Sequence, residues 1–224
     1  MYVGIDGCRA GWLVASIDQE TRLHHGIIQN LDELPAIPPK LCLIDIPLHF
    51  ADTTYRSCEV AAQALLGVKK RASIFFTPHW GAVYATTYAE ANRLNRLHIG
   101  KGVSKQTWNI CGKIKEANRF MRDHPTYPLR EAHPELSFYY LNQRQPLLSR
   151  KSTLEGATDR LEIIARYADR YPQVIANTLK MTKRKDVKPD DVIDATILAI
   201  RASESTLQCV PANRPFGTQD VILY

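Results

Sequence analysis

The chain has 224 residues, of which 45% are hydrophobic and 23% are charged, and its formal net charge at pH 7 is +6. That length allows one domain with a sizeable core, with or without an insertion, and argues against a second full domain. The ordinary composition, without a low-complexity run or an internal repeat, argues against disordered and solenoid classes. The positive charge is compatible with a nucleic-acid partner and equally with a solvated basic surface.

The first third of the chain predicts strands. Alternating apolar residues predict an antiparallel meander over 2–6, 11–17 and 23–29, with turns supplied by Gly7, Gly11 and Asp18. The apolar run over 41–46 is bounded by Pro47 and predicts a central strand buried on both faces.

The middle of the chain predicts helices. One is expected over 55–66, ending at Gly67, and another over about 84–97. Ser104 is a suitable cap for a third helix, whose apolar residues from Val103 to Met121 recur at spacings of three and four.

The last part mixes both kinds of element. A strand is expected over 128–133, after which Pro134 can start a helix. A long helix over about 153–171 is expected to stop before Pro172. A heavily buried helix over 190–203 and a terminal strand over 220–223 complete the chain.

This order of elements predicts an α/β fold with an RNase H-like mixed sheet, in which three antiparallel strands are followed by parallel strands flanked by helices. We expect a single domain over residues 1–224. The stretch over about 75–123 is longer than a simple crossover needs, so it predicts a helical cap inserted into the domain.

No segment predicts a membrane protein. The longest apolar stretches, such as the one over 192–200, are too short to cross a bilayer, and no signal peptide is visible after Met1. The five cysteines are scattered without a C-x-x-C pair, and their odd number argues against a complete disulfide framework. We therefore expect a cytoplasmic protein with no membrane partner. The oligomeric state stays open.

Acidic residues occur where strands are expected to end. Asp6 closes the first strand, at the edge where open α/β sheets place ligands, although Asp6-Gly7 could also be an ordinary hairpin turn. Asp45 lies within an apolar run, and a buried carboxylate needs a partner. That partner could be structural or functional.

The last helix and a late strand supply further acids. Asp190 and Asp191 could merely cap the helix, whereas Asp194 is surrounded by apolar residues and shares a face with Asp191. Glu131 shares one side of its strand with His133 and could reach the same edge as Asp6 and Asp45. Carboxylates that converge in this way would hold Mg²⁺ or Mn²⁺ and support phosphodiester hydrolysis.

Several segments together resemble the DUF429 family, whose members are regarded as RNase H-like predicted nucleases. The resemblance spans nearly the whole chain and is carried by the segments 3–12, 44–47, 102–108, 113–116, 131–138, 151–156 with Arg160, and 190–195. It implies that Asp6, Asp45 and Asp194 are the acidic positions of the fold, with Asp191 and Glu131 as further candidates.

The resemblance also implies phosphate contacts by four basic residues, each of which could equally serve in an ion pair or on the surface. They are Arg9, Lys105, Lys151 and Arg160. The leading hypothesis is thus a Mg²⁺- or Mn²⁺-dependent nuclease in which Asp6, Asp45, Glu131 and Asp194 are catalytic and Asp6, Asp45, Asp191 and Asp194 bind metal.

Two other functions stay open. Sugar kinases and actin-like ATPases use a related strand and Asp-Gly turn near their phosphates, which would make this a nucleotide-binding phosphotransferase. The chain is short for such proteins, which usually pair two domains. A binding module that keeps the RNase H-like fold without its chemistry is the other alternative.

Overall fold

The computed structural model describes residues 1–212, 214–215 and 220–224. The chain divides into two compact units, each described separately below. Unit 1 comprises residues 1–45, 126–208 and 223–224, and unit 2 comprises residues 46–125 and 209–222. The single domain that the sequence predicts stays a prediction, and the expected cap region, about 75–123, contributes three helices to unit 2.

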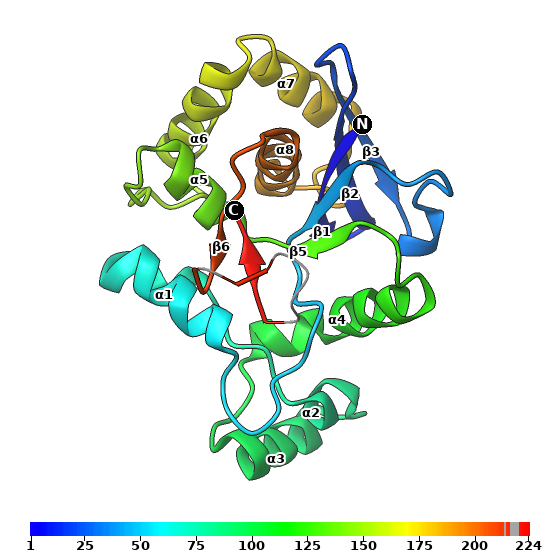
Figure 1. Ribbon diagram of the computed structural model, residues 1–224, viewed down its shortest axis with the longest axis vertical. Helices are drawn as coiled ribbons and strands as arrows, with labels where there is room; N and C mark the ends of the chain where they lie inside the picture. The colour runs from blue at the N-terminus through cyan, green and yellow to red at the C-terminus, as the bar shows by residue number, and fades with distance from the viewer. Residues whose placement is uncertain (213, 216–219) are drawn as a thin grey trace. The chain divides into compact units, whose positions relative to one another are not determined.

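Unit 1 is built on a five-stranded mixed sheet with the strand order β3-β2-β1-β4-β5. The first three strands are antiparallel, whereas β4 pairs in parallel with both β1 and β5 (Figure 1). This confirms the RNase H-like mixed sheet that the sequence predicts. The strands are β1 (Tyr2–Cys8), β2 (Gly11–Ile17), β3 (Leu23–Ile28), β4 (Leu41–Ile44) and β5 (Leu129–Glu131).

Helix α8 (Pro189–Ser203) packs against β1, β2 and β4, and α5, α6 and α7 also contact it (Figure 1). All of its residues from Asp191 to Ala202 are buried, as its apolar composition predicts. Gly4 makes the contact with β1 close, since a Cβ atom there would lie 2.2 Å from the Ala195 carbonyl oxygen and 2.3 Å from the Ala199 nitrogen. Only glycine, which has no Cβ atom, allows the two backbones to lie this close together.

The remaining helices of unit 1 agree less closely with the helices predicted from the sequence. The helix expected over 153–171 is α6, which ends earlier, at Tyr167, and a second helix that the sequence did not predict, α7, begins at Tyr171. Pro172 lies in the first turn of α7, where its fixed φ is favourable, so it starts a helix instead of ending one. The other helical elements of the unit are η1 (Leu31–Glu33), α5 (Pro134–Leu141), α6 (Leu154–Tyr167) and α7 (Tyr171–Met181).

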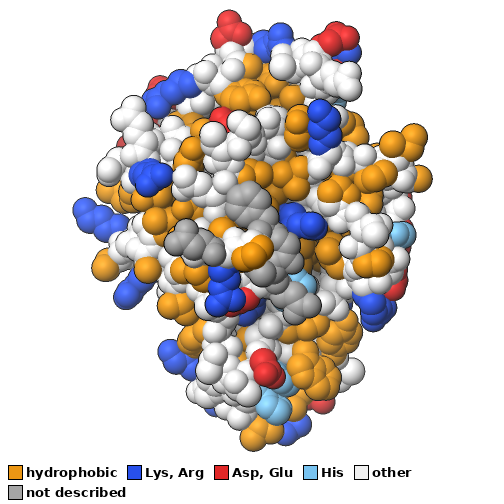
Figure 2. Space-filling model, in the orientation of Figure 1, with side chains coloured by type: hydrophobic (Ala, Val, Ile, Leu, Met, Phe, Trp, Pro, Cys, Tyr) orange, Lys and Arg blue, Asp and Glu red, His pale blue; other side chains and the backbone are white. Residues whose placement is uncertain are grey.

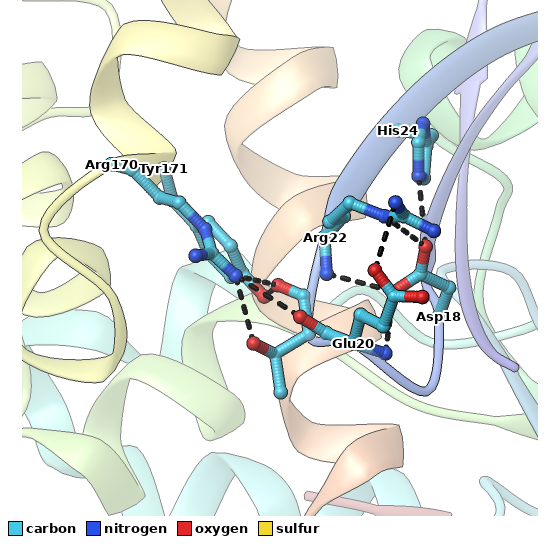
Figure 3. A network of polar contacts seen from close by, with 7 residues as sticks. Asp18, Glu20, Arg22, His24, Arg170 and Tyr171 are labelled. Carbon is cyan, nitrogen blue, oxygen red and sulfur yellow. Dashed lines mark hydrogen bonds and ion pairs between the residues drawn. The ribbon is translucent and has the colours of Figure 1, made fainter.

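The turn between β2 and β3 is held to the start of α7 (Figure 3). Thr21 has a left-handed backbone, with φ 59°, and its carbonyl oxygen accepts hydrogen bonds from Arg170 at 2.7 Å and from the Tyr171 hydroxyl at 2.7 Å. Within the turn, Asp18 accepts hydrogen bonds from the backbone and side chain of Arg22. These bonds lower the pKa of Asp18 and fix the tip of the hairpin.

Unit 2 is mainly helical. Its described elements are α1 (Ser57–Lys70), η2 (Arg71–Ser73), α2 (Trp80–Tyr84), α3 (Tyr88–Ile99), α4 (Lys105–Asp123) and β6 (Cys209–Val210). Strand β7 (Ile222–Leu223) is shorter than the strand expected over 220–223 and pairs with β6 in a second sheet. The boundary between the two units falls within β7, between Ile222 and Leu223.

Two helix boundaries in unit 2 differ from those expected. Helix α1 continues past Gly67 to Lys70, with a kink where Gly67 has φ 69°. The helix expected over 84–97 is α3, which starts only at Tyr88 because the Thr87 side chain accepts a hydrogen bond from the Glu90 N–H. Ser104 caps α4 as predicted, by accepting a hydrogen bond from the Thr107 N–H.

Among the described residues, no helix is both long and apolar enough to span a bilayer. The five cysteines, all within the described part of the chain, are buried and free of disulfide bonds.

Candidate active site

Asp6 lies within β1, which continues to Cys8 and turns into β2 at Arg9 and Ala10. The hairpin-turn interpretation of Asp6-Gly7 is therefore wrong. On the other side of β1, the parallel pairing with β4 ends at Ile5 and Ile44. Asp6 thus lies one residue beyond the last parallel pair of β1 and β4, at the edge of the sheet where the carboxyl ends of parallel strands meet.

Asp45 follows β4 and lies beside Asp6. Its N–H donates a hydrogen bond of 2.9 Å to the Ile5 carbonyl oxygen, which continues the parallel register by one residue. Side chains on paired strands share a face when their positions match, so Asp6 and Asp45 project toward the same face as Gly4. That is the face covered by α8.

Asp194 reaches this face from α8. The helix runs antiparallel to β1, because Gly4 meets Ala195 and Ala199 whereas Asp6 interacts with Asp194 and Asp191, nearer the helix N-terminus. The three carboxylates of Asp6, Asp45 and Asp194 therefore come from two strands and a helix of unit 1. The positive end of the helix dipole points toward them.

The acidic residues affect one another's titration. Burial, followed by the negative charges of Asp45 and Asp194, raises the pKa of Asp6 well above its ordinary value. Burial also raises the pKa of Asp194 to about 6, even though the neighbouring Lys151 acts in the opposite direction. Both shifts mean that the negative charges at this edge are incompletely compensated by the protein.

Lys151 supplies the nearest positive charge. Its Nζ donates a hydrogen bond of 2.8 Å to Asp194 Oδ2, and its side chain is 45% exposed whereas that of Asp194 is 2% exposed. Burial lowers the pKa of Lys151, but the carboxylates of Asp194, Asp45 and Asp6 outweigh this effect and raise it overall. One exposed ammonium group thus faces three carboxylates.

Asp191 lies at the margin of this cluster, whereas Glu131 lies on the other face of the sheet. Asp191 accepts a hydrogen bond of 2.8 Å from the Lys188 N–H, so it caps α8, and burial raises its pKa. It is still near enough to raise the pKa of Asp6. Glu131 pairs with Ile44, one position before Asp45, and therefore projects from the opposite face of the sheet. The register does not bring Glu131 to the side of Asp6.

Arg160 is a structural ion-pair residue in this structure and is not placed to act as a phosphate contact. Its side chain is 1% exposed, and its guanidinium group donates a hydrogen bond of 2.6 Å to Glu135 Oε1 and another of 2.8 Å to the Gly156 carbonyl oxygen. Glu135 in turn starts α5, where its N–H donates to the His133 side chain. A nucleic-acid backbone cannot reach a guanidinium group buried in this way.

The other basic candidates are exposed. Arg9 lies at the β1–β2 turn, and its N–H donates to the Asp186 carbonyl oxygen. Lys105 belongs to unit 2, where its Nζ lies 3.6 Å from the centroid of the Tyr88 ring. Arg9 and Lys151 are thus the exposed cations among the candidates in unit 1.

A divalent cation suits the chemistry of these groups. Asp194 Oδ1 is buried and accepts no hydrogen bond from any residue that the structure describes, and the surrounding carboxylates are hard oxygen donors of the kind that Mg²⁺ and Mn²⁺ prefer. The side chains are not preassembled, however. Within the described part of the chain, no three His, Cys, Asp or Glu residues are grouped closely enough to hold a metal ion.

The pairings of Lys151 with Asp194 and of Arg160 with Glu135 are not apparent from the sequence. Their partners are separated by 43 and 25 residues respectively. The local signal at Glu135 is the sequence His133-Pro134-Glu135, which indicates only a helix start. Nothing in the sequence around Lys151 indicates which carboxylate it contacts.

Comparison with known proteins places the chain by family alone. The model of DUF429, described as a protein family of unknown function, matches residues 4–215. No curated protein and no solved structure is similar enough to count as a match.

Proposed function

We propose that this chain, which belongs to the DUF429 family, is a divalent-metal-dependent nuclease that hydrolyses phosphodiester bonds. The observation that carries the proposal is the incompletely compensated acidic cluster of Asp6, Asp45 and Asp194 at the carboxyl edge of an RNase H-like sheet. Protein sites with strongly shifted carboxyl pKa values are frequently functional.

The three carboxylates would hold Mg²⁺ or Mn²⁺, which when bound lowers the pKa of water and stabilises the leaving oxygen of a phosphodiester. Asp194 has one buried oxygen available for this role, and its other oxygen is held by Lys151. Because the Lys151 side chain is 45% exposed, its ammonium group can leave Asp194 and approach a phosphate oxygen. Arg9, also exposed, is the second cation of unit 1 suited to a phosphate.

The first test is metal binding by titration calorimetry with Mg²⁺ and Mn²⁺. The parent protein should bind, and Asp6→Asn, Asp45→Asn and Asp194→Asn should each lose binding. Asp169→Asn, which removes an exposed aspartate of unit 1, should bind like the parent. Equal loss in the control, or no binding by the parent, would contradict the metal site.

The second test is cleavage of labelled RNA, DNA and hybrid substrates with either metal. The proposal expects cleavage that Asp45→Asn abolishes and Asp169→Asn retains. Metal binding without cleavage of any substrate would favour a binding module instead. Thermal stabilisation by ATP, combined with no cleavage, would favour the phosphotransferase alternative.

A further inference from the structure

Unit 2 carries three lysine side chains that lie over tyrosine rings. Lys101 Nζ is 5.6 Å from the centroid of Tyr55, Lys105 Nζ is 3.6 Å from that of Tyr88, and Lys115 Nζ is 5.4 Å from that of Tyr84. We call these six residues the lysine–tyrosine surface. Each pair presents a positive charge next to the flat face of an aromatic ring.

Two of the lysines lie along one side of α4. Lys105, Trp108, Gly112 and Lys115 recur at spacings of three and four, and a side chain added at Gly112 would meet no atom within 4 Å. The rings of Trp108 and Tyr88 pack together at a tilt, with their centroids 6.1 Å apart. From Lys105 to Lys115 the helix rises about 15 Å, so this side is long enough to contact several units of a polymer.

A cavity adjoins the N-terminal end of the same helix. Its volume is about 180 Å³, and its lining includes Tyr55, Phe76, Lys101 and Ser104. Tyr55 and Phe76 stack on each other with their centroids 3.8 Å apart, so part of the lining is aromatic. Pockets for drug-sized ligands begin at roughly 300 Å³. This cavity therefore suits one planar ring better than a whole cofactor.

Further aromatic surface in unit 2 is exposed. Tyr84 is 45% exposed and Trp80 is 56% exposed. In Figure 2, hydrophobic and histidine side chains lie together over α2 and α3, whereas lysine and arginine side chains are dispersed over the face shown. A large basic patch of the kind that binds duplex backbones is not visible on that face.

From these observations we infer that the lysine–tyrosine surface binds single-stranded nucleic acid, with an unpaired base stacked on the exposed ring of Tyr84 and phosphates contacted by the lysines. An exposed aromatic ring close to several cations suits the bases and phosphates of a single strand. A duplex hides its base faces within the helical stack, so it could use only the cations. The inference deepens the proposed nuclease function by naming the substrate class.

The test is fluorescence anisotropy of the full-length protein with labelled single-stranded DNA and RNA and with a duplex of equal length. A metal chelator is present, so binding is read without cleavage. The single strands should bind more tightly than the duplex. Tyr84→Ala should weaken single-strand binding roughly tenfold, while Tyr84→Phe, which keeps the ring, should bind like the parent and show that the position tolerates substitution.

The lysines are tested by the salt dependence of binding. Lys105→Ala and Lys115→Ala should each weaken binding and lower the salt slope by about one. The matched control is Lys69→Ala, which removes an exposed lysine of α1 that lies in the same unit. The inference is overturned if the duplex binds as tightly as the single strands, or if the control loses as much affinity as the two variants.

The two proposals fail separately. Single-strand binding with this mutational profile, but no cleavage with any metal, would overturn the nuclease proposal and leave the inference intact. Cleavage that depends on Asp45 but is insensitive to Tyr84→Ala and Lys115→Ala, with no preference for single strands, would overturn the inference and leave the nuclease proposal intact.

Discussion

Helix α8 meets strand β1 in two places that are built in opposite ways. At Gly4 the backbones touch, and the contact consists of apolar groups and main-chain atoms. Two residues further along β1, at Asp6, carboxylates from the strand and the helix face each other and raise one another's pKa. The contact at Gly4 stabilises the fold. The carboxylates at Asp6 repel one another and therefore lower the stability of the fold. Such a contrast is typical of functional sites.

The largest expected effect is at the tight contact. Gly4→Ala should destabilise the protein by about 4 kcal/mol or more, because the added Cβ would overlap the backbone of α8 and force the helix away from the sheet. Urea denaturation measures the loss. The control is Gly26→Ala in β3, where an added Cβ would meet no atom within 4 Å. Similar stability of the two variants would contradict the close packing described at Gly4.

The buried pair of Glu135 and Arg160 contrasts with the carboxylates at Asp6, because here a carboxylate faces a group of opposite charge. Glu135→Ala should cost about 3–4 kcal/mol, since it leaves a guanidinium group buried without its carboxylate. The double variant Glu135→Ala/Arg160→Met should recover part of that loss, as measured by thermal and urea denaturation. A single variant as stable as the parent would argue that the pair is dispensable.

His25 offers a third contact with α8 and a pH test. Its ring nitrogens lie 2.8 Å from the Thr178 hydroxyl and 2.9 Å from the Thr196 hydroxyl, and burial lowers its pKa to about 4. The unfolded chain then binds a proton near pH 6.5 that the folded protein binds only near pH 4. Stability from this group is full above pH 6.5 and falls by about 3 kcal/mol as the pH drops to 4.

The measurement is the stability of the parent and of His25→Asn across that pH range. The difference between the two should shrink as the pH falls from 6.5 to 4, since only the parent loses this contribution. Asp194 titrates in both proteins and cancels in the difference. A difference that is independent of pH would show that His25 is not held neutral by its surroundings.

The smallest expected effect, and the one with the opposite sign, is at Asp6. Asp6→Asn should stabilise the protein by about 1 kcal/mol at pH 7, because it removes a charge that burial and two carboxylates disfavour. Asn keeps an oxygen for the 2.7 Å hydrogen bond from the Gly7 N–H. Thermal denaturation at pH 7 and at pH 4 checks this.

The gain at Asp6→Asn should diminish at the lower pH. A raised carboxyl pKa means that the folded protein takes up a proton there and the parent loses its charge. Asp169→Asn should leave the melting temperature unchanged at both pH values. Destabilisation by Asp6→Asn would mean that the charge of Asp6 is compensated in the folded protein.

Much of the fold follows from local patterns. Alternation of apolar residues predicts β1, β2 and β3, Ser104 predicts the start of α4, and Pro134 predicts the start of α5, because strand period, capping and fixed φ all act within a few residues. Pro172 shows the limit of such rules. The same residue is compatible with the end of one helix and with the start of the next.

The sequence by itself determined which acidic residues are unusual, since Asp45 and Asp194 have apolar neighbours in the chain whatever fold it adopts. Only the tertiary structure decided how they are arranged. The register of β5 puts Glu131 on the face away from Asp6, and packing pairs Lys151 with Asp194 and Arg160 with Glu135. The physical reason is that a one-residue change of register reverses the face of a side chain, and ion pairs between distant segments form only once those segments pack.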